Sequence, residues 1–139
     1  MLCTLISRAS AVLLAAGGFL LLFAPDLVLG SLIPGYPPTG AWLAQLLAAA
    51  WLGLASLDWI SRGALLGGIY GRPVVAANAV SYFVGATSLL KAALRPGQPA
   101  ALWLVAALLA LFAALYGWLL LRGPFERDVA MHTGQQRPA

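Results

Sequence analysis

Four long apolar segments limit what this chain of 139 residues can fold into. They cover residues 5–24, 41–60, 73–94 and 101–121. A helix of about 20 residues rises about 30 Å, which is the thickness of the hydrocarbon core of a lipid bilayer. No water is present in that core to satisfy backbone N–H and C=O groups, so each segment is expected to be a membrane-spanning helix.

The charged residues are too few to cover a water-facing surface. They make up 9% of the chain, whereas soluble domains carry about 25%. The net charge of +4 comes from single Lys and Arg residues between apolar segments, a pattern typical of orientation signals and not of a nucleic-acid-binding patch. We predict an all-α fold, an integral membrane antiparallel four-helix bundle over residues 1–122, with a polar cytoplasmic tail at 123–139.

The positions of the basic residues predict the orientation of the bundle. With both termini on one side of the membrane, the opposite side receives Lys91 and Arg95. The side of the termini receives Arg8, Arg62, Arg72, Arg122, Arg127 and Arg137. Because cytoplasmic loops of membrane proteins are enriched in Lys and Arg, we expect cytoplasmic N- and C-termini.

Small and polar residues at spacings of three and four predict the helix contacts, because membrane helices associate through close packing of such residues. In the first segment these are Ser10, Gly17 and Ala24. In the second segment they are Gln45, Ala48, Ala49, Leu52 and Ser56, and in the third they are Asn78, Ser81, Gly85 and Ser88. The connection at residues 25–40 is rich in proline and glycine yet apolar, so we expect an irregular loop on the membrane surface or over the mouth of the bundle.

Asp58 interrupts the end of the second apolar segment. At 100° per residue it lies about 220° from Gln45, nearly opposite the predicted contact stripe. We expect an ion pair with Arg62, four residues on, at the level of the lipid head groups. The alternative is a buried acid paired with Arg72 or Asn78, because an acid within a membrane is a candidate functional group.

The candidate ligand-binding residues are the polar side chains of the second and third segments. They are Gln45, Asp58, Asn78, Ser81 and Tyr82. Their alternative role is to hold the bundle together by hydrogen bonds between helices. The sole histidine, His132, lies in the tail, and no segment offers metal or haem ligands at helical spacing. We therefore predict no metal, no cofactor and no catalytic residue.

Three stretches resemble small bacterial four-span membrane proteins of the broad DoxX-like type. They are "LLFAPDLVLGSLIPG", "LAQLLAAAWLGLASLDW" and "GRPVVAANAVSYFVGATSLLKAAL". The resemblance covers most of residues 10–121 and implies a four-span fold and a location in the cell membrane, a bacterial inner membrane, but no reaction. Many DoxX-like proteins have an arginine near the start of the second span, where this chain has Gln45, so a charge-dependent role of that position does not carry over.

These features predict a non-catalytic multi-pass membrane protein. It would be an accessory or scaffold subunit of a membrane complex, or a binder of a lipophilic molecule. Two alternatives remain open: a small transporter or channel that acts as an oligomer, and a membrane enzyme that acts on a lipid or isoprenoid. The expected partners are membrane lipids and a larger membrane complex or further copies of the chain, without nucleic acid.

Overall fold

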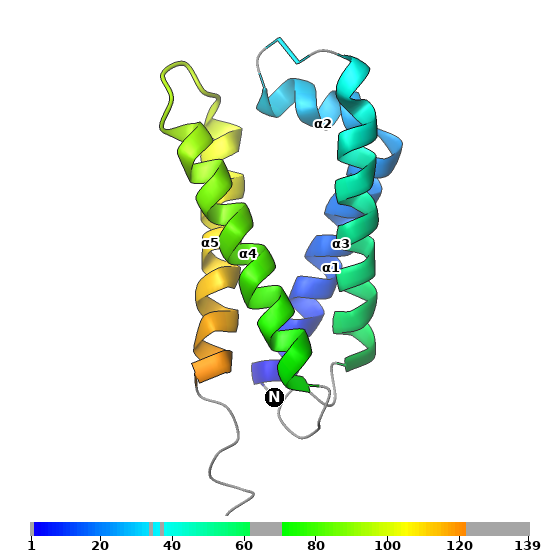
Figure 1. Cartoon of the computed structure of the whole chain (residues 1–139), viewed down its shortest axis with the longest axis vertical. Coiled ribbons are helices and arrows are strands. Elements are labelled where there is room, and N and C mark those ends of the chain that lie inside the picture. The colour runs from blue at the N-terminus through cyan, green and yellow to red at the C-terminus, as the bar shows by residue number, and fades with distance from the viewer. Residues whose placement is uncertain (1, 34, 37, 62–70, 122–139) are drawn as a thin grey trace, which may run out of the picture.

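The computed structural model describes residues 2–33, 35–36, 38–61 and 71–121, and these residues form an all-helical structure (Figure 1). Four long helices are α1 (Leu2–Phe23), α3 (Ala41–Ser61), α4 (Gly71–Ala93) and α5 (Ala100–Leu121). A short helix α2 (Pro25–Leu32) and a 3-10 turn η1 (Pro38–Gly40) lie between α1 and α3. The prediction of an all-α fold is confirmed.

Each long helix corresponds to one of the predicted apolar segments. The helices contain 21 to 23 residues, and all four are long and apolar enough to cross a membrane. Most of their large apolar side chains point outward, including Phe83, Leu104 and Leu121. Arg62, the glycine-rich stretch at 63–70 and the predicted tail at 123–139 lie outside the described residues.

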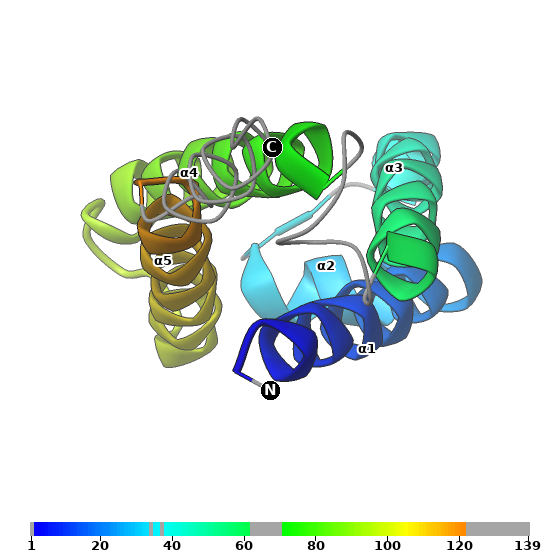
Figure 2. The same ribbon diagram turned by 90° about the horizontal axis from the view of Figure 1, so that it is seen from below.

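The long helices pack as two pairs, α1 with α3 and α4 with α5 (Figures 1 and 2). Glycine allows α1 and α3 to approach closely. A Cβ atom on Gly17 would lie 2.6 Å from the ring of Trp51, and one on Gly18 would lie 2.9 Å from the side chain of Leu52. The two pairs touch each other through far fewer residues than the helices within each pair.

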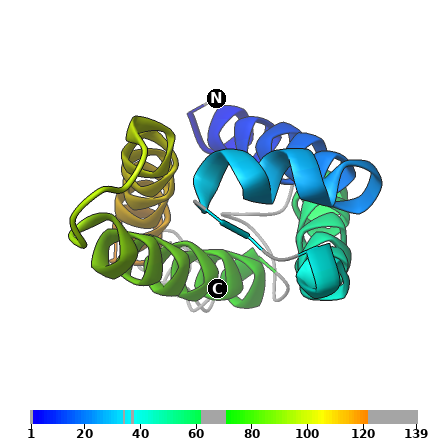
Figure 3. The ribbon, with the colours of Figure 1, turned by 90° about the horizontal axis from the view of Figure 1, so that it is seen from above.

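The segment between α1 and α3 differs from the irregular loop that we expected. Residues 25–32 form the helix α2, which lies across the end of the molecule where α1 ends and α3 begins (Figure 3). Pro25 occupies the first turn, where its missing N–H costs no hydrogen bond, and Asp26 lies near the positive end of the helix dipole. Val28 and Leu29 pack against an apolar cluster of Leu21 on α1 and of Ala44 and Ala48 on α3.

The two pairs meet at the opposite end, where α1 begins and α3 ends; we call this the lower end, as drawn in Figure 1. A single apolar cluster there contains residues of all four long helices. Its members include Ile6 of α1, Ala55 of α3, Val75 of α4 and Phe112 of α5. The buried polar side chains Ser7, Ser10, Asp58 and Asn78 lie at this junction.

The observed contact faces of α3 and α4 match the predicted stripes only in part. Ala48 of α3 and Asn78 of α4 are buried as predicted. The buried residues of α3 are Ala44, Ala48, Ala55 and Asp58. Gln45 and Ser56, which we placed in the contact stripe, are exposed. The three alanines on the buried face let α1 lie close to α3. Asp58 lies on the same face. The buried face of α3 is therefore rotated about the helix axis relative to the predicted stripe.

Candidate functional site

Six polar side chains meet inside the lower end of the molecule, and we call them the polar cluster. Every long helix contributes to it. The members are Ser7 and Ser10 of α1, Asp58 of α3, Asn78 and Tyr82 of α4, and Tyr116 of α5. None of them is more than 2% exposed, so the cluster is closed to its surroundings.

The carboxylate of Asp58 is the centre of the cluster. Its Oδ1 accepts a hydrogen bond of 2.5 Å from Nδ2 of Asn78. Its Oδ2 accepts one of 2.5 Å from Oγ of Ser10 and a longer one of 3.3 Å from the hydroxyl of Tyr116. A single side chain of α3 is thereby bonded to α1, α4 and α5.

The hydroxyl groups of α1 extend the network. Ser7 Oγ donates to the backbone carbonyl of Asp58 at 2.8 Å. Ser10 Oγ and the Tyr82 hydroxyl lie 2.7 Å apart. A serine hydroxyl has one hydrogen, and that of Ser10 goes to Asp58, so Tyr82 is the donor in the bond between Ser10 and Tyr82.

Asn78 has a fixed orientation within the cluster. Its Nδ2 donates both to Asp58 and, at 3.1 Å, to the carbonyl of Val74 one turn earlier in α4. Both amide hydrogens are therefore used, because a carboxylate and a carbonyl can only accept. The amide oxygen Oδ1 of Asn78 is buried and has no hydrogen-bond partner among the described residues.

Aromatic packing holds the tyrosines in place. The ring of Tyr82 stacks on Phe112 at a centroid distance of 5.1 Å and on Tyr116 at 5.7 Å. Phe112 and Tyr116 are four residues apart and so project from the same face of α5. The stack joins α4 to α5 and directs both hydroxyl groups toward α1 and Asp58.

The described side chains that bond to the carboxylate of Asp58 are polar and uncharged. Its side-chain partners in the described part of the chain are Ser10, Asn78 and Tyr116, all neutral groups. Of the two placements considered from the sequence, the structure shows the buried one, and Asn78 is a bonded partner of Asp58. Arg62, the partner in the other placement, lies outside the described residues.

The five residues predicted to bind a ligand do not form one site. Asp58, Asn78 and Tyr82 meet in the polar cluster, whereas Gln45 and Ser81 are exposed on the outer surfaces of α3 and α4. Ser81 precedes Tyr82 by one residue, which turns it 100° away from the tyrosine on the helix.

Three members of the cluster were absent from the predicted ligand-binding residues: Ser7, Ser10 and Tyr116. Of these, Ser10 was predicted to lie on the contact face of the first segment, and it is buried there. Ser7 and Ser10 are three residues apart, a spacing that puts both on one face of α1. Two hydroxyl groups on one face of an apolar helix were a usable signal that this face meets a polar partner. Tyr116 lies in an almost wholly apolar segment, and its hydroxyl had no such companion.

The cluster has the groups for hydrogen bonding but not for metal binding. Within residues 2–61 and 71–121, as far as the structure describes them, no three His, Cys, Asp or Glu side chains come together. Chemically, the cluster joins four helices through one carboxylate, and its donors are occupied by internal acceptors. In this arrangement Asp58 and Tyr82 present almost no surface to a substrate.

Comparisons of this chain with models of protein families, with curated proteins and with solved structures gave no match.

Proposed function

We propose that this chain is a non-catalytic integral membrane protein that crosses the bilayer four times as an antiparallel bundle and binds lipophilic molecules or partner proteins on its outer surface. The polar cluster carries this proposal. Six polar side chains, withdrawn from solvent and bonded to one another, are what a bundle needs to fix its helices, because an unpaired polar group in hydrocarbon is costly. They leave no free nucleophile or base for a reaction.

The apolar outer surface supports a membrane location. Large apolar side chains are exposed on all four long helices, for example Leu20, Leu46, Val84 and Leu111. A soluble monomer rarely exposes apolar patches larger than a few hundred Å². In a bilayer these side chains contact lipid tails at no cost.

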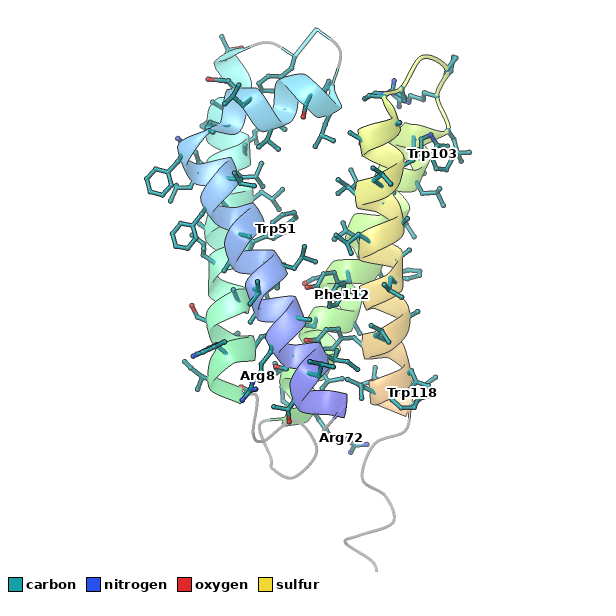
Figure 4. All side chains as sticks on the ribbon, turned by 180° about the vertical axis from the view of Figure 1, so that it is seen from behind. Arg8, Trp51, Arg72, Trp103, Phe112 and Trp118 are labelled. Atoms are coloured by element: carbon teal, nitrogen blue, oxygen red, sulfur yellow. The ribbon has the colours of Figure 1, made fainter. Side chains whose placement is uncertain are left out.

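The described cations fit the proposed orientation in a bacterial inner membrane. Arg8 and Arg72 lie at the lower end (Figure 4), and we propose that this end, with both termini, faces the cytoplasm. Lys91 and Arg95 belong to the opposite end, near the end of α4. In the sequence, six Arg residues are assigned to the side of the termini, and Lys91 and Arg95 to the opposite side. This difference favours the lower end as the cytoplasmic side.

Extraction of membranes and native mass spectrometry test this proposal. The protein is expected to stay in membranes that are washed with sodium carbonate. After solubilisation in mild detergent, its native mass spectrum should show bound lipid or a partner protein. A protein released by carbonate would contradict the membrane location. A bare monomer without lipid or partner would contradict the binding role.

A proton-coupled transporter is the second candidate, and one observation favours it. Asp58 is a buried carboxyl group whose described side-chain partners are all neutral, and buried acids in transporters serve as proton carriers. Proton-driven flux in reconstituted vesicles that is abolished by Asp58→Asn and kept by Asp26→Asn would replace our first proposal with this one. Equal flux in vesicles with and without the protein would remove it.

A further inference from the structure

A groove runs along the outer side of the contact between α1 and α3, and we call it the α1–α3 groove. Its volume is about 530 Å³, within the range of about 300–1,000 Å³ found for small-molecule sites. Its lining residues are Ala11, Val12, Phe19, Leu52, Ala55, Ser56, Trp59 and Ile60. The wall formed by α1 from Val12 to Phe19 extends roughly 10 Å along the helix axis.

The lining offers almost only apolar contacts. The one hydroxyl group, that of Ser56, already donates to the carbonyl of Leu52 at 2.9 Å. Phe19, Trp59 and Ile60 are each at least half exposed and form bulky rims. A ligand that fills this groove must therefore be an apolar chain that fits between large side chains.

A cation lies at the lower end of the groove. Arg8 precedes Val12 by four residues and Ala11 by three, so it shares their face of α1. Side chains of a helix lean toward its N-terminus, which here is the lower end. Figure 4 shows Arg8 there, at the level where α3 ends. Arg8 is exposed and has no ion pair within the part of the chain that the structure describes.

We propose that the α1–α3 groove binds an acyl chain of an anionic phospholipid whose phosphate pairs with Arg8. This inference rests on the proposed membrane location. A guanidinium group matches the geometry of a phosphate, with two parallel hydrogen bonds. The apolar groove above Arg8 receives the acyl chain, so one ligand satisfies both parts of the site.

A second transmembrane helix fits this groove less well. Interfaces between membrane helices are enriched in small residues, which let the backbones approach. Here Phe19, Trp59 and Ile60 project from the rims and would hold a partner helix away. A lipid chain is narrow and flexible enough to lie between these side chains, and only a phospholipid also supplies an anion beside Arg8.

Competition between two lipids with identical acyl chains tests the site. The full chain in mild detergent is mixed with equal amounts of phosphatidylglycerol and phosphatidylcholine, and bound lipids are counted by native mass spectrometry. The attraction of one arginine for an anionic head group is expected to favour phosphatidylglycerol roughly five-fold. Arg8→Gln should bring this ratio close to one, whereas Arg95→Gln, at the other end of the bundle, should leave it unchanged.

A variant with a larger side chain in the α1–α3 groove tests whether the acyl chain binds there. Ser56→Leu places a larger side chain in the groove and should reduce the occupancy of both lipids, while Ser81→Leu on the exposed face of α4 should not. An unchanged lipid ratio in Arg8→Gln, or unchanged occupancy in Ser56→Leu, would overturn the site.

Disulfide cross-linking between copies of a Cys3→Ser, Ser56→Cys variant in membranes would also overturn it, because the groove would then hold a second chain. Release of the protein by carbonate would instead refute the membrane location on which the site depends.

Discussion

Asn78 donates a hydrogen bond of 2.5 Å to the carboxylate of Asp58, and this bond is one of those that link the two helix pairs, which touch each other far less than the helices within each pair do. Ser10 and Tyr116 bond to the same carboxylate from α1 and α5. The lower end of the molecule is therefore held by one acid and three donors from three helices. At the other end α2 lies across the molecule and packs mainly on α1 and α3.

Removal of the central acid should destabilise the bundle strongly. Asp58→Ala leaves the donor groups of Ser10, Asn78 and Tyr116 buried without an acceptor. Since an unsatisfied buried polar group costs about 1–3 kcal/mol, we expect a loss of at least about 2 kcal/mol in the free energy of unfolding. Unfolding in mixed detergent micelles, followed by circular dichroism, measures it. Asp26→Ala, on the exposed surface of α2, is the control, and an equal loss in both variants would contradict the role of Asp58.

The coupling between Asp58 and Asn78 should be measurable by a double-mutant cycle. The variants Asp58→Ala, Asn78→Ala and their combination should show an interaction free energy of about 0.5–3 kcal/mol, the range found for residues in direct contact. The same cycle with Gln45→Ala in place of Asn78→Ala should give an interaction free energy near zero, because Gln45 is exposed on another face of α3. Additive effects of Asp58 and Asn78 would show that their bond does not join the helix pairs.

The positions of the helices in the chain were predictable from the sequence, but the face of each helix that is buried was not. Long apolar segments define membrane helices because backbone groups have no other partner in lipid. Within such a segment both the outward-facing and the buried residues are apolar, so hydrophobicity does not tell the buried face from the exposed one. Gln45 and Ser81 were consequently assigned to the interior although they are exposed. Ser56 and Thr87 show why exposed hydroxyl groups are tolerated: each donates to a carbonyl of its own helix.

The site was predictable in part. Asp58 and Asn78 were both recognised as candidates, because an acid or an amide in an apolar helix needs a partner. Ser7 shares a face of α1 with Ser10, which was predicted as a contact residue, so this face could have been recognised as polar. The position of Tyr116 depends on the rotation and depth of α5, which apolar sequence does not specify. The helix α2 was missed because its turn-forming residues, Gly30 and the prolines after it, resemble those of a loop.

The two tyrosines of the cluster should contribute differently. The hydroxyl oxygen of Tyr82 lies 2.7 Å from Oγ of Ser10, whereas the hydroxyl oxygen of Tyr116 lies 3.3 Å from Oδ2 of Asp58. Tyr82→Phe should therefore lower the free energy of unfolding by about 1 kcal/mol, within the range measured for hydrogen bonds between membrane helices, and Tyr116→Phe by less. Both variants keep the aromatic stack with Phe112, so the comparison isolates the hydroxyl groups. A larger loss in Tyr116→Phe would show that the direct bond to Asp58 dominates.

The close approach of α1 to α3 should make Gly17 intolerant of a side chain. A Cβ atom there would lie 2.6 Å from one carbon of the Trp51 ring and 2.9 Å from another, so the indole, which also packs against both apolar clusters, would have to move. We expect Gly17→Ala to destabilise the protein by about 1–3 kcal/mol, the usual cost of overpacking. This cost opposes the gain of up to about 1 kcal/mol that alanine brings to a helix.

Gly53→Ala is the matched control for Gly17→Ala. It lies in α3, and a Cβ atom there would meet nothing within 4 Å. Without a clash, only the helix propensity of alanine acts, so Gly53→Ala should be neutral or slightly stabilising. Unfolding of both variants in the same detergent, with Trp51 fluorescence followed in a variant whose other tryptophans are replaced by phenylalanine, separates the two effects. If the two alanine variants were equally stable, α1 and α3 would not pack as closely at Gly17 as the structure shows.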